Sequence, residues 1–292
     1  MLSVPRVLLS QIILFTNAFT NAFTNAFTNT FTSSLFTNKL NQKMIANTFN
    51  YPKNKYSDFT SYQSRFDSGL NNPTIIQGGG TLRTWSYKSP HVEQVHVQVS
   101  SQGRPIDSDI ELWQGPDNTP CKMRVYTENG AITPFYAVIE TPHGPNTIAI
   151  RNIGQFEFPL LAEVNAENII TPSAECLNSF MAIQGGAIRT YPFSPVVESS
   201  QIMIRTDGRP LNARIELLQG PNNNRQVIEL YTDDGLDKPF FCILKTPGAG
   251  NVIRILNTSP IEFPLQASVT PNSIEREVNM NPNTNTEPVF GY

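Results

Sequence analysis

Short runs in which apolar and polar residues alternate recur between residues 81 and 269 of the chain. The clearest are VHVQV at Val95–Val99 and its later counterpart QIMIR at Gln201–Arg205. Successive side chains of a strand point to opposite faces, so this period of two predicts strands with one buried face. Other short runs rich in β-branched, aromatic or aliphatic residues lie at Thr81–Trp85, Ile110–Trp113, Met123–Thr127, Phe135–Ile139, Thr147–Ile150 and Leu160–Val164.

Turn-forming residues separate these runs at nearly even spacing. They include Gly103–Pro105, Gly115-Pro116, Asn129-Gly130, Thr141-Pro142 and Phe158-Pro159. Glycine and proline favour turn geometries and end strands. No segment shows a sustained apolar period of 3.6 residues, so we expect very little helix. The pattern predicts an all-β protein built as a β-sandwich, of the jelly-roll or immunoglobulin-like type.

The pattern occurs twice. IELWQGP at Ile110–Pro116 returns as IELLQGP at Ile215–Pro221, and residues 89–164 align without a gap with residues 194–269, with 31 of 76 positions identical. Glycine and proline dominate the retained positions, which indicates that most of them specify backbone conformation. The chain is therefore a tandem duplication. We expect one β-sandwich repeat at residues 74–167, a linker at 168–180 and a second repeat at 181–271.

The first 43 residues have a different character. Arg6 precedes the apolar run Val7–Phe15, small residues follow it, and a repeat FTNA leads into a basic, hydroxyl-rich stretch. Residues 1–57 contain no Asp or Glu. An apolar run this short does not span a bilayer, and its flanks are typical of a signal peptide. The order predicts a signal followed by a transit-like segment over residues 1–43, as in the two-part address of algae with secondary plastids; a secretory signal with a low-complexity spacer is the alternative.

Extended arms flank the two repeats in this interpretation. Residues 44–73 interleave basic and aromatic residues, which is typical either of a docking segment or of an arm that packs on the first repeat. Residues 272–292 are rich in Asn, Pro and Thr and cannot fold alone. Phe290 and Tyr292 give this flexible tail two apolar anchors for a neighbouring subunit.

Composition excludes some classes of function. The formal net charge of -3 leaves no strong electrostatic footprint for nucleic acid. Three cysteines in a chain of 292 residues do not indicate a disulfide framework and agree with a reducing compartment. We expect no membrane span in the mature protein.

Candidate catalytic and metal-binding residues are sparse. His91, His96 and His143 are not retained in the second repeat, so we expect no metal site and no cofactor. Glu111 and Glu157 could be proposed as a glycosidase pair. However, Glu111 lies between Ile110 and Leu112, so it should point away from the core, where Arg83 or Arg104 could neutralise it. We therefore expect a protein that is not an enzyme.

Other repeated side chains suit contacts between domains or between subunits. The Gly78–Gly80 run lacks the features of a phosphate loop and is better explained by a tight turn or a close backbone approach. Trp85, Tyr87 and Trp113 could form a sugar-stacking face, which keeps a carbohydrate-binding protein as the alternative function. The candidates for assembly contacts are Arg83, Arg189, Arg104, Arg209, Glu111, Glu216, Trp113, Phe290 and Tyr292.

These paired motifs resemble the pyrenoid shell proteins of diatoms and related algae. The motifs are Gln77–Gly79 and Gln184–Gly186, Gly103–Pro105 and Gly208–Pro210, the two IELxQGP strings, Tyr126–Gly130 and Tyr231–Gly235, and Glu157–Leu160 and Glu262–Leu265. The resemblance covers about residues 75–270. It implies a structural protein without catalytic residues that assembles from identical subunits, with related shell proteins and Rubisco as further candidate partners. It also implies an open lattice around the Rubisco-containing pyrenoid, in the plastid stroma, that supports carbon dioxide fixation.

Overall fold

The computed structural model describes residues 73–274 with the exception of residues 168 and 222. This part of the chain is almost entirely β-structure, with sixteen strands in two eight-stranded sheets. The predicted all-β class is confirmed. The targeting segment at residues 1–43, all but the last residue of the arm at 44–73 and nearly all of the tail at 272–292 lie outside the described residues.

The first repeat supplies eight strands. They are β1 (Thr74–Ile76), β2 (Thr81–Tyr87), β3 (Gln94–Ser100), β4 (Ile106–Trp113), β5 (Cys121–Thr127), β6 (Phe135–Glu140), β7 (Asn146–Asn152) and β8 (Leu160–Asn165). The predicted runs all lie within these strands. Most of the strands extend further than the apolar runs, because ladder hydrogen bonds continue through polar residues such as Asp107 and Asp109.

The second repeat supplies the other eight strands. They are β9 (Met181–Ile183), β10 (Ile188–Pro192), β11 (Val197–Arg205), β12 (Leu211–Gln219), β13 (Asn224–Thr232), β14 (Phe240–Lys245), β15 (Asn251–Asn257) and β16 (Leu265–Ile274). Between the repeats, the short helix α4 (Ala174–Asn178) begins after Ser173, whose side chain accepts a hydrogen bond from the Cys176 amide. None of the helices in the described residues is long and apolar enough to cross a membrane.

Each repeat is a jelly roll. Within the first repeat the strand order is β1-β8-β3-β6 in one sheet and β2-β7-β4-β5 in the other. The second repeat has the same order, β9-β16-β11-β14 and β10-β15-β12-β13. This distribution of eight antiparallel strands over two sheets is the jelly-roll arrangement, one of the two sandwich types that the sequence left open.

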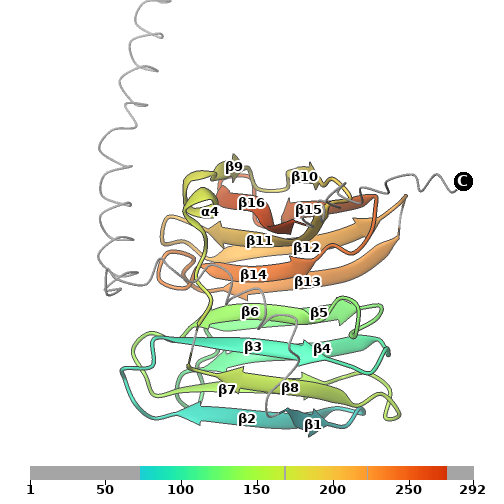
Figure 1. The fold of residues 1–292 in the computed structure, drawn as a ribbon. Helices are drawn as coiled ribbons and strands as arrows, with labels where there is room; N and C mark the ends of the chain where they lie inside the picture. Colours follow the sequence, from blue (N-terminus) through green and yellow to red (C-terminus); the bar gives the residue numbers. More distant parts are fainter. Residues whose placement is uncertain (1–72, 168, 222, 275–292) are drawn as a thin grey trace, which may run out of the picture. The chain divides into compact units, whose positions relative to one another are not determined.

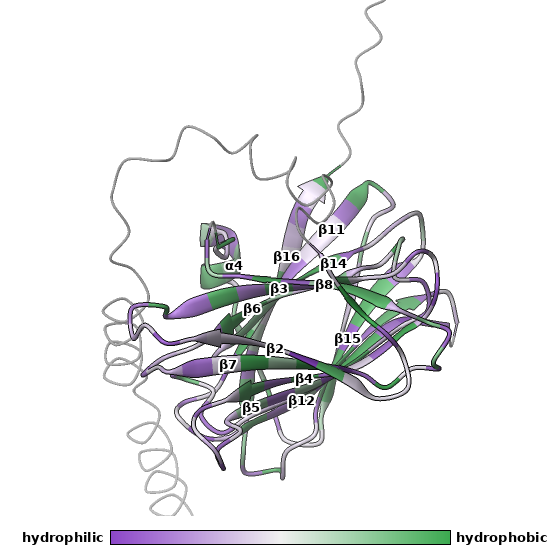
Figure 2. Ribbon diagram, turned by 90° about the horizontal axis from the view of Figure 1, so that it is seen from below, coloured by the Kyte–Doolittle hydropathy of each residue, from purple (hydrophilic) through white to green (hydrophobic). Residues whose placement is uncertain are grey.

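The two jelly rolls form continuous sheets (Figure 1). In the first sheet, sheet A, β6 pairs with β14; in the second, sheet B, β5 pairs with β13 over seven residue pairs, from Gln226–Thr127 to Thr232–Cys121. Both sheets enclose one hydrophobic core, to which both repeats contribute. Figure 2 shows the sheets as two layers with α4 outside sheet A. The duplication therefore produces a single sandwich of twice the width.

An approximate two-fold axis relates the two repeats. Arg124 pairs with Glu229 in sheet B, and Ala137 pairs with Cys242 in sheet A. In each pair the second residue is the first one's counterpart at the offset of 105, so the axis passes between them. The ends of the β5–β13 ladder agree: the Glu128 amide donates to the Arg225 carbonyl, and the Asp233 amide donates to that of Pro120, both at 2.9 Å.

Candidate assembly surfaces

A row of alternating charges crosses the outer face of sheet B. In register, it runs from Arg214 on β12 through Glu229 on β13, Arg124 on β5 and Asp109 on β4 to Arg151 on β7. Arg214 Nη1 lies 2.6 Å from Glu229 Oε1. The burial of Asp109 raises the pKa of its carboxyl, although the Arg124 guanidinium partly opposes this. The row is a structural consequence of joining two repeats at this edge.

The two repeats carry opposite charges at equivalent points of this row. Arg124 corresponds to Glu229, and Asp109 corresponds to Arg214. Had the copies remained identical, two like charges would face each other at the axis, which destabilises a cross-strand pair. The sequence reasoning missed these residues because it considered only retained side chains. The signal was present as charge inversion between the aligned copies.

Glu216 is the most enclosed charge on this face. It is 6% exposed, and its carboxylate accepts hydrogen bonds from Arg214 Nε at 2.7 Å and from Arg254. Burial by itself would raise its pKa, but the hydrogen bonds from Arg214 and Arg254 outweigh this and hold the pKa below its ordinary value. The partners of Glu216 are thus Arg214 and Arg254, and not Arg189 or Arg209, the counterparts of Arg83 and Arg104. Two strand neighbours neutralise it because they lie within reach on the same face.

Glu111 and Trp113 lie together on the outer face of β4. The Trp113 indole nitrogen donates a hydrogen bond of 2.7 Å to Glu111 Oε2, and Lys122 is the cross-strand neighbour of Glu111. Here too neither Arg83 nor Arg104 is the strand neighbour. Ile110 and Leu112 are fully buried, so the predicted alternation along this strand is confirmed. Glu157, the other member of the hypothetical glycosidase pair, lies in the turn before β8 rather than on β4.

The outer end of each repeat is formed by its glycine motif and the corner loop before its last strand. A Cβ atom on Gly78 would lie 1.8 Å from the Gln155 carbonyl oxygen, and one on Gly185 would lie 1.8 Å from that of Pro260. This confirms that the glycine run serves a close backbone approach. The aromatic rings of the corner loops contact arginines from the loops before β4 and β12: the Arg104 guanidinium lies 5.5 Å from the centre of the Phe158 ring, and that of Arg209 lies 5.4 Å from the Phe263 ring.

Arg83 and Arg189 lie on the outermost strands of sheet B, β2 and β10. Each arginine lies two residues before an aromatic residue, Trp85 or Tyr191, and so shares a face of its strand with it. Both aromatic rings pack against the core. The Tyr87 hydroxyl also turns inward and donates to the Val164 carbonyl at 3.2 Å. These rings therefore contribute to the core at the rim of the sandwich and do not form the open stacking face that the sequence suggested.

Several retained polar side chains work inside each repeat rather than between repeats. Asn152 Nδ2 donates to the carbonyls of Ile76 and Phe158, and Asn257 makes the equivalent bonds to Ile183 and Phe263. The other pairs, Asn146 and Asn251, and Gln114 and Gln219, bond to the Pro142 and Pro247 loops in the same way. These side chains therefore satisfy buried backbone groups within their own repeat rather than groups across the junction between the repeats.

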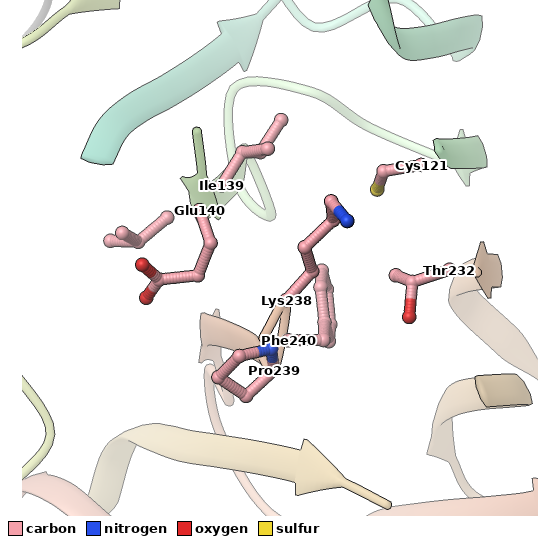
Figure 3. A pocket seen from close by; sticks show the side chains of 8 residues that line it. Cys121, Ile139, Glu140, Thr232, Lys238, Pro239 and Phe240 are labelled. Carbon is pink, nitrogen blue, oxygen red and sulfur yellow. The ribbon is translucent and has the colours of Figure 1, made fainter. Parts of the chain in front are cut away.

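A small pocket lies where the two repeats meet (Figure 3). Its lining comes from both repeats: Cys121, Val138, Ile139, Glu140, Thr232, Lys238, Pro239 and Phe240. Burial raises the pKa of Glu140 to about 8, partly opposed by a hydrogen bond of 2.7 Å from Gln94 Nε2. Burial also raises the pKa of Cys121 to about 12. A thiol with this pKa stays protonated at neutral pH and lacks the thiolate that a nucleophile requires.

The histidines and cysteines do not converge within the described residues. His91 lies in the turn before β3, whereas the His96 ring stacks on Tyr136 with 5.7 Å between centroids. Cys121, Cys176 and Cys242 are buried free thiols. No group of three or more His, Cys, Asp or Glu side chains in residues 73–274 is arranged to hold a metal ion. Phe290 and Tyr292 lie outside the described residues.

Comparison with known proteins identifies one family. The sequence model of the family described as diatom pyrenoid shell protein matches residues 67–271, a span that includes both jelly rolls except the last three residues of β16. No curated protein matches the chain. Among solved structures, the crystal structure of PBSX exported protein XepA is similar at 10% identity, with 68% of this chain and 86% of that chain covered and a TM-score of 0.23.

Proposed function

Because the chain belongs to the diatom pyrenoid shell protein family, we propose that it is a building block of a protein sheet around the Rubisco-containing pyrenoid of the plastid. The family match over both jelly rolls carries this proposal. The role is structural: identical subunits, with related shell proteins as further candidates, form an open lattice in the stroma at the pyrenoid periphery. The sheet supports carbon dioxide fixation by retaining the gas near the enzyme, and Rubisco is a candidate direct partner.

The shape of the fold supports a building-block role. The joined sandwich is wide and has two faces of different character. Sheet B exposes a regular row of charges. Sheet A is crossed by the linker, because the Ser173 amide donates to Gln201 Oε1 at 2.9 Å and Cys176 is fully buried. A unit with unlike faces can give a layer an inner and an outer side.

The tail provides a second element of the proposal. β16 ends at Ile274, and eighteen residues follow it. We expect this segment to hold a neighbouring subunit through Phe290 and Tyr292, since two aromatic side chains can anchor a peptide segment on the surface of another subunit.

Electron microscopy of the purified chain without residues 1–43 tests the proposal. We expect sheets or tubes, and a chain that remains monomeric at high concentration across salt and pH would contradict it. Removal of Thr284–Tyr292 should weaken the lattice, with the exchange of both Phe290 and Tyr292 for Ala as the matched variant. A fluorescent tag at the C-terminus should mark a rim around the pyrenoid, whereas export of the tagged protein or specific glycan binding would favour the carbohydrate-binding alternative.

A further inference from the structure

Each jelly roll has two sides at which the edge strands of its two sheets end, and only one of these sides pairs with the other repeat. The sides formed by β5 and β6 and by β13 and β14 meet at the junction. The opposite sides end in β1 and β2 on one repeat and in β9 and β10 on the other. Within the described residues these outermost strands have no strand on their outer edge. The two ends are equivalent to each other by the approximate two-fold axis.

Within residues 73–274, strand β2 has no pairing partner on its outer edge. It has seven residues, TLRTWSY, with high β-propensity and one charge, Arg83, and contains neither proline nor lysine. Natural proteins usually shield a long exposed edge with charges, proline, a bulge or a covering segment, because its free backbone groups recruit another strand. The equivalent strand β10 is shorter, IRTYP, and ends in Pro192. The ends therefore differ in how they present backbone groups.

The donors on each free edge follow from the pairing. The Phe193 amide donates inward, to the Asn251 carbonyl on β15, at 3.0 Å. Because alternate residues of a strand point their amides to opposite sides, Ile188, Thr190 and Pro192 face the free edge, and proline has no N–H to offer. The equivalent positions on β2 are Leu82, Thr84 and Ser86, all of which have one. The free edge of β2 thus presents three backbone N–H donors, whereas that of β10 presents two, because Pro192 has none.

Exposed apolar side chains gather beside both edges. At the second repeat's end, Ile188 is 57% exposed and Ile261 in the corner loop is 76% exposed. At the first repeat's end, Ile75 is 56% exposed and Phe156, the counterpart of Ile261, is 73% exposed. Apolar residues next to an unpaired strand edge are suited to burial in an interface.

We propose that β2 of one copy of the chain pairs with β10 of the next copy, so that sheet B continues from subunit to subunit. Sheet B consists of eight strands that alternate in direction, so β2 and β10 run in opposite directions. A neighbour related by simple translation therefore meets β2 with an antiparallel β10. Repetition of this head-to-tail contact gives an open row.

In an extended row, pairing of like ends would have to alternate contacts between two β2 edges with contacts between two β10 edges. If two β10 edges paired, each would bring a proline to the same short ladder, whereas β2 with β10 involves one. Because the two strands would be antiparallel, Phe156 beside the start of β2 and Ile261 beside the start of β10 would lie at opposite ends of this contact. This contact rests on the proposed assembly and specifies one of the contacts that a sheet needs.

Proline substitutions at the free edges test the proposal in the chain without residues 1–43. Thr84→Pro and Thr190→Pro each remove an outward N–H without loss of an internal bond. We expect each to raise the critical concentration for assembly by about tenfold or more, as the loss of roughly 1.4 kcal/mol per contact would. Thr84→Val, which keeps the N–H, is the matched control. Pro192→Ser, which adds a donor, should lower the critical concentration.

The oligomeric state of the single variants separates the two modes of pairing. A head-to-tail contact uses one β2 and one β10, so Thr84→Pro and Thr190→Pro each weaken every contact of the row, and neither leaves an intact pair of edges. A Thr84→Pro dimer joined through two β10 edges, or a Thr190→Pro dimer joined through two β2 edges, at a concentration at which the wild type assembles would indicate pairing of like ends and overturn the proposal. A folded Thr84→Pro protein with the same critical concentration as wild type would also overturn the proposed contact. In that case the assembly of the wild-type protein would still support the shell role. If wild type itself fails to assemble, the proposed function fails.

A second variant covers the case in which Thr84→Pro does not fold, as judged by circular dichroism. Ser86→Pro copies into β2 the proline that the second repeat carries at Pro192, so the fold accommodates it. It should also raise the critical concentration. Unchanged assembly of both Ser86→Pro and Pro192→Ser would overturn the proposal without reference to Thr84.

Discussion

Arg124 and Glu229 occupy the same position in the two repeats and face each other in register at the centre of the junction between β5 and β13. The duplicated module thus pairs with its own copy, and the residue nearest the axis has opposite charge in the two copies. This divergence turns a contact that would repel between identical modules into one that attracts. The two repeats therefore carry different charges at the surface where they pair.

The charge inversion predicts a specific rescue. Glu229→Arg places two arginines opposite each other and removes one of the two carboxylate partners of Arg214. We expect the free energy of unfolding to fall by about 0.5–1 kcal/mol, a modest loss because the Arg124 and Glu229 side chains are half exposed. Adding Arg124→Glu should recover part of the loss. Urea unfolding of the two single variants and the double variant measures the coupling, and additive effects would show that the pair does not interact.

Glu216 should stabilise the second repeat in a pH-dependent manner. Glu216→Gln leaves the Arg214 and Arg254 guanidinium groups without their shared carboxylate, and we expect a loss on the order of 1–2 kcal/mol at pH 7. The folded pKa of Glu216 is lowered, so its contribution is complete above the unfolded value near 4.5 and disappears as pH falls through the folded value. The difference from wild type should therefore shrink toward pH 3. Glu111→Gln on the equivalent strand is the control, with a smaller expected effect.

Glu140 should act in the opposite direction. Its folded pKa is raised to about 8, so the folded state holds a proton that the unfolded chain releases near pH 4.5. Stability should fall as pH rises from about 4.5 to about 8, by on the order of a few kcal/mol. Glu140→Gln should be nearly insensitive to pH over this range and more stable than wild type at pH 9. Melting temperatures at pH 6 and pH 9 test this, with the exposed Glu157→Gln as control; an equal slope in both variants would refute it.

Asn152 should be among the costliest positions to change. Its buried amide bonds to two backbone carbonyls, and its oxygen accepts from the Gly154 amide at 3.0 Å. Asn152→Ala leaves these groups unpaired in the interior, and we expect a loss of about 2–4 kcal/mol. Asn257→Ala should have a similar cost, because its bonds are the same. Loss of under 1 kcal/mol by chemical denaturation in either variant would contradict the assigned role.

The secondary structure class, the duplication and the inward positions could be predicted from the amino-acid pattern. Alternation at Ile110, Glu111 and Leu112 is a local property, because neighbouring residues of a strand point to opposite faces whatever the strand pairs with. The close approach at Gly78 could also be anticipated, since no other residue lacks a Cβ.

The pairing of strand edges could not be predicted in this way and is seen only in the folded chain. Hydrogen bonds between strands join backbone groups that are the same in every residue, so the sequence does not state that β5 pairs with β13 or that β2 and β10 remain outermost. For the same reason the roles of Arg124, Glu229 and Asn152 appeared only in the fold. The first two depend on register across the junction, and Asn152 depends on loops that come together from residues 76 and 158.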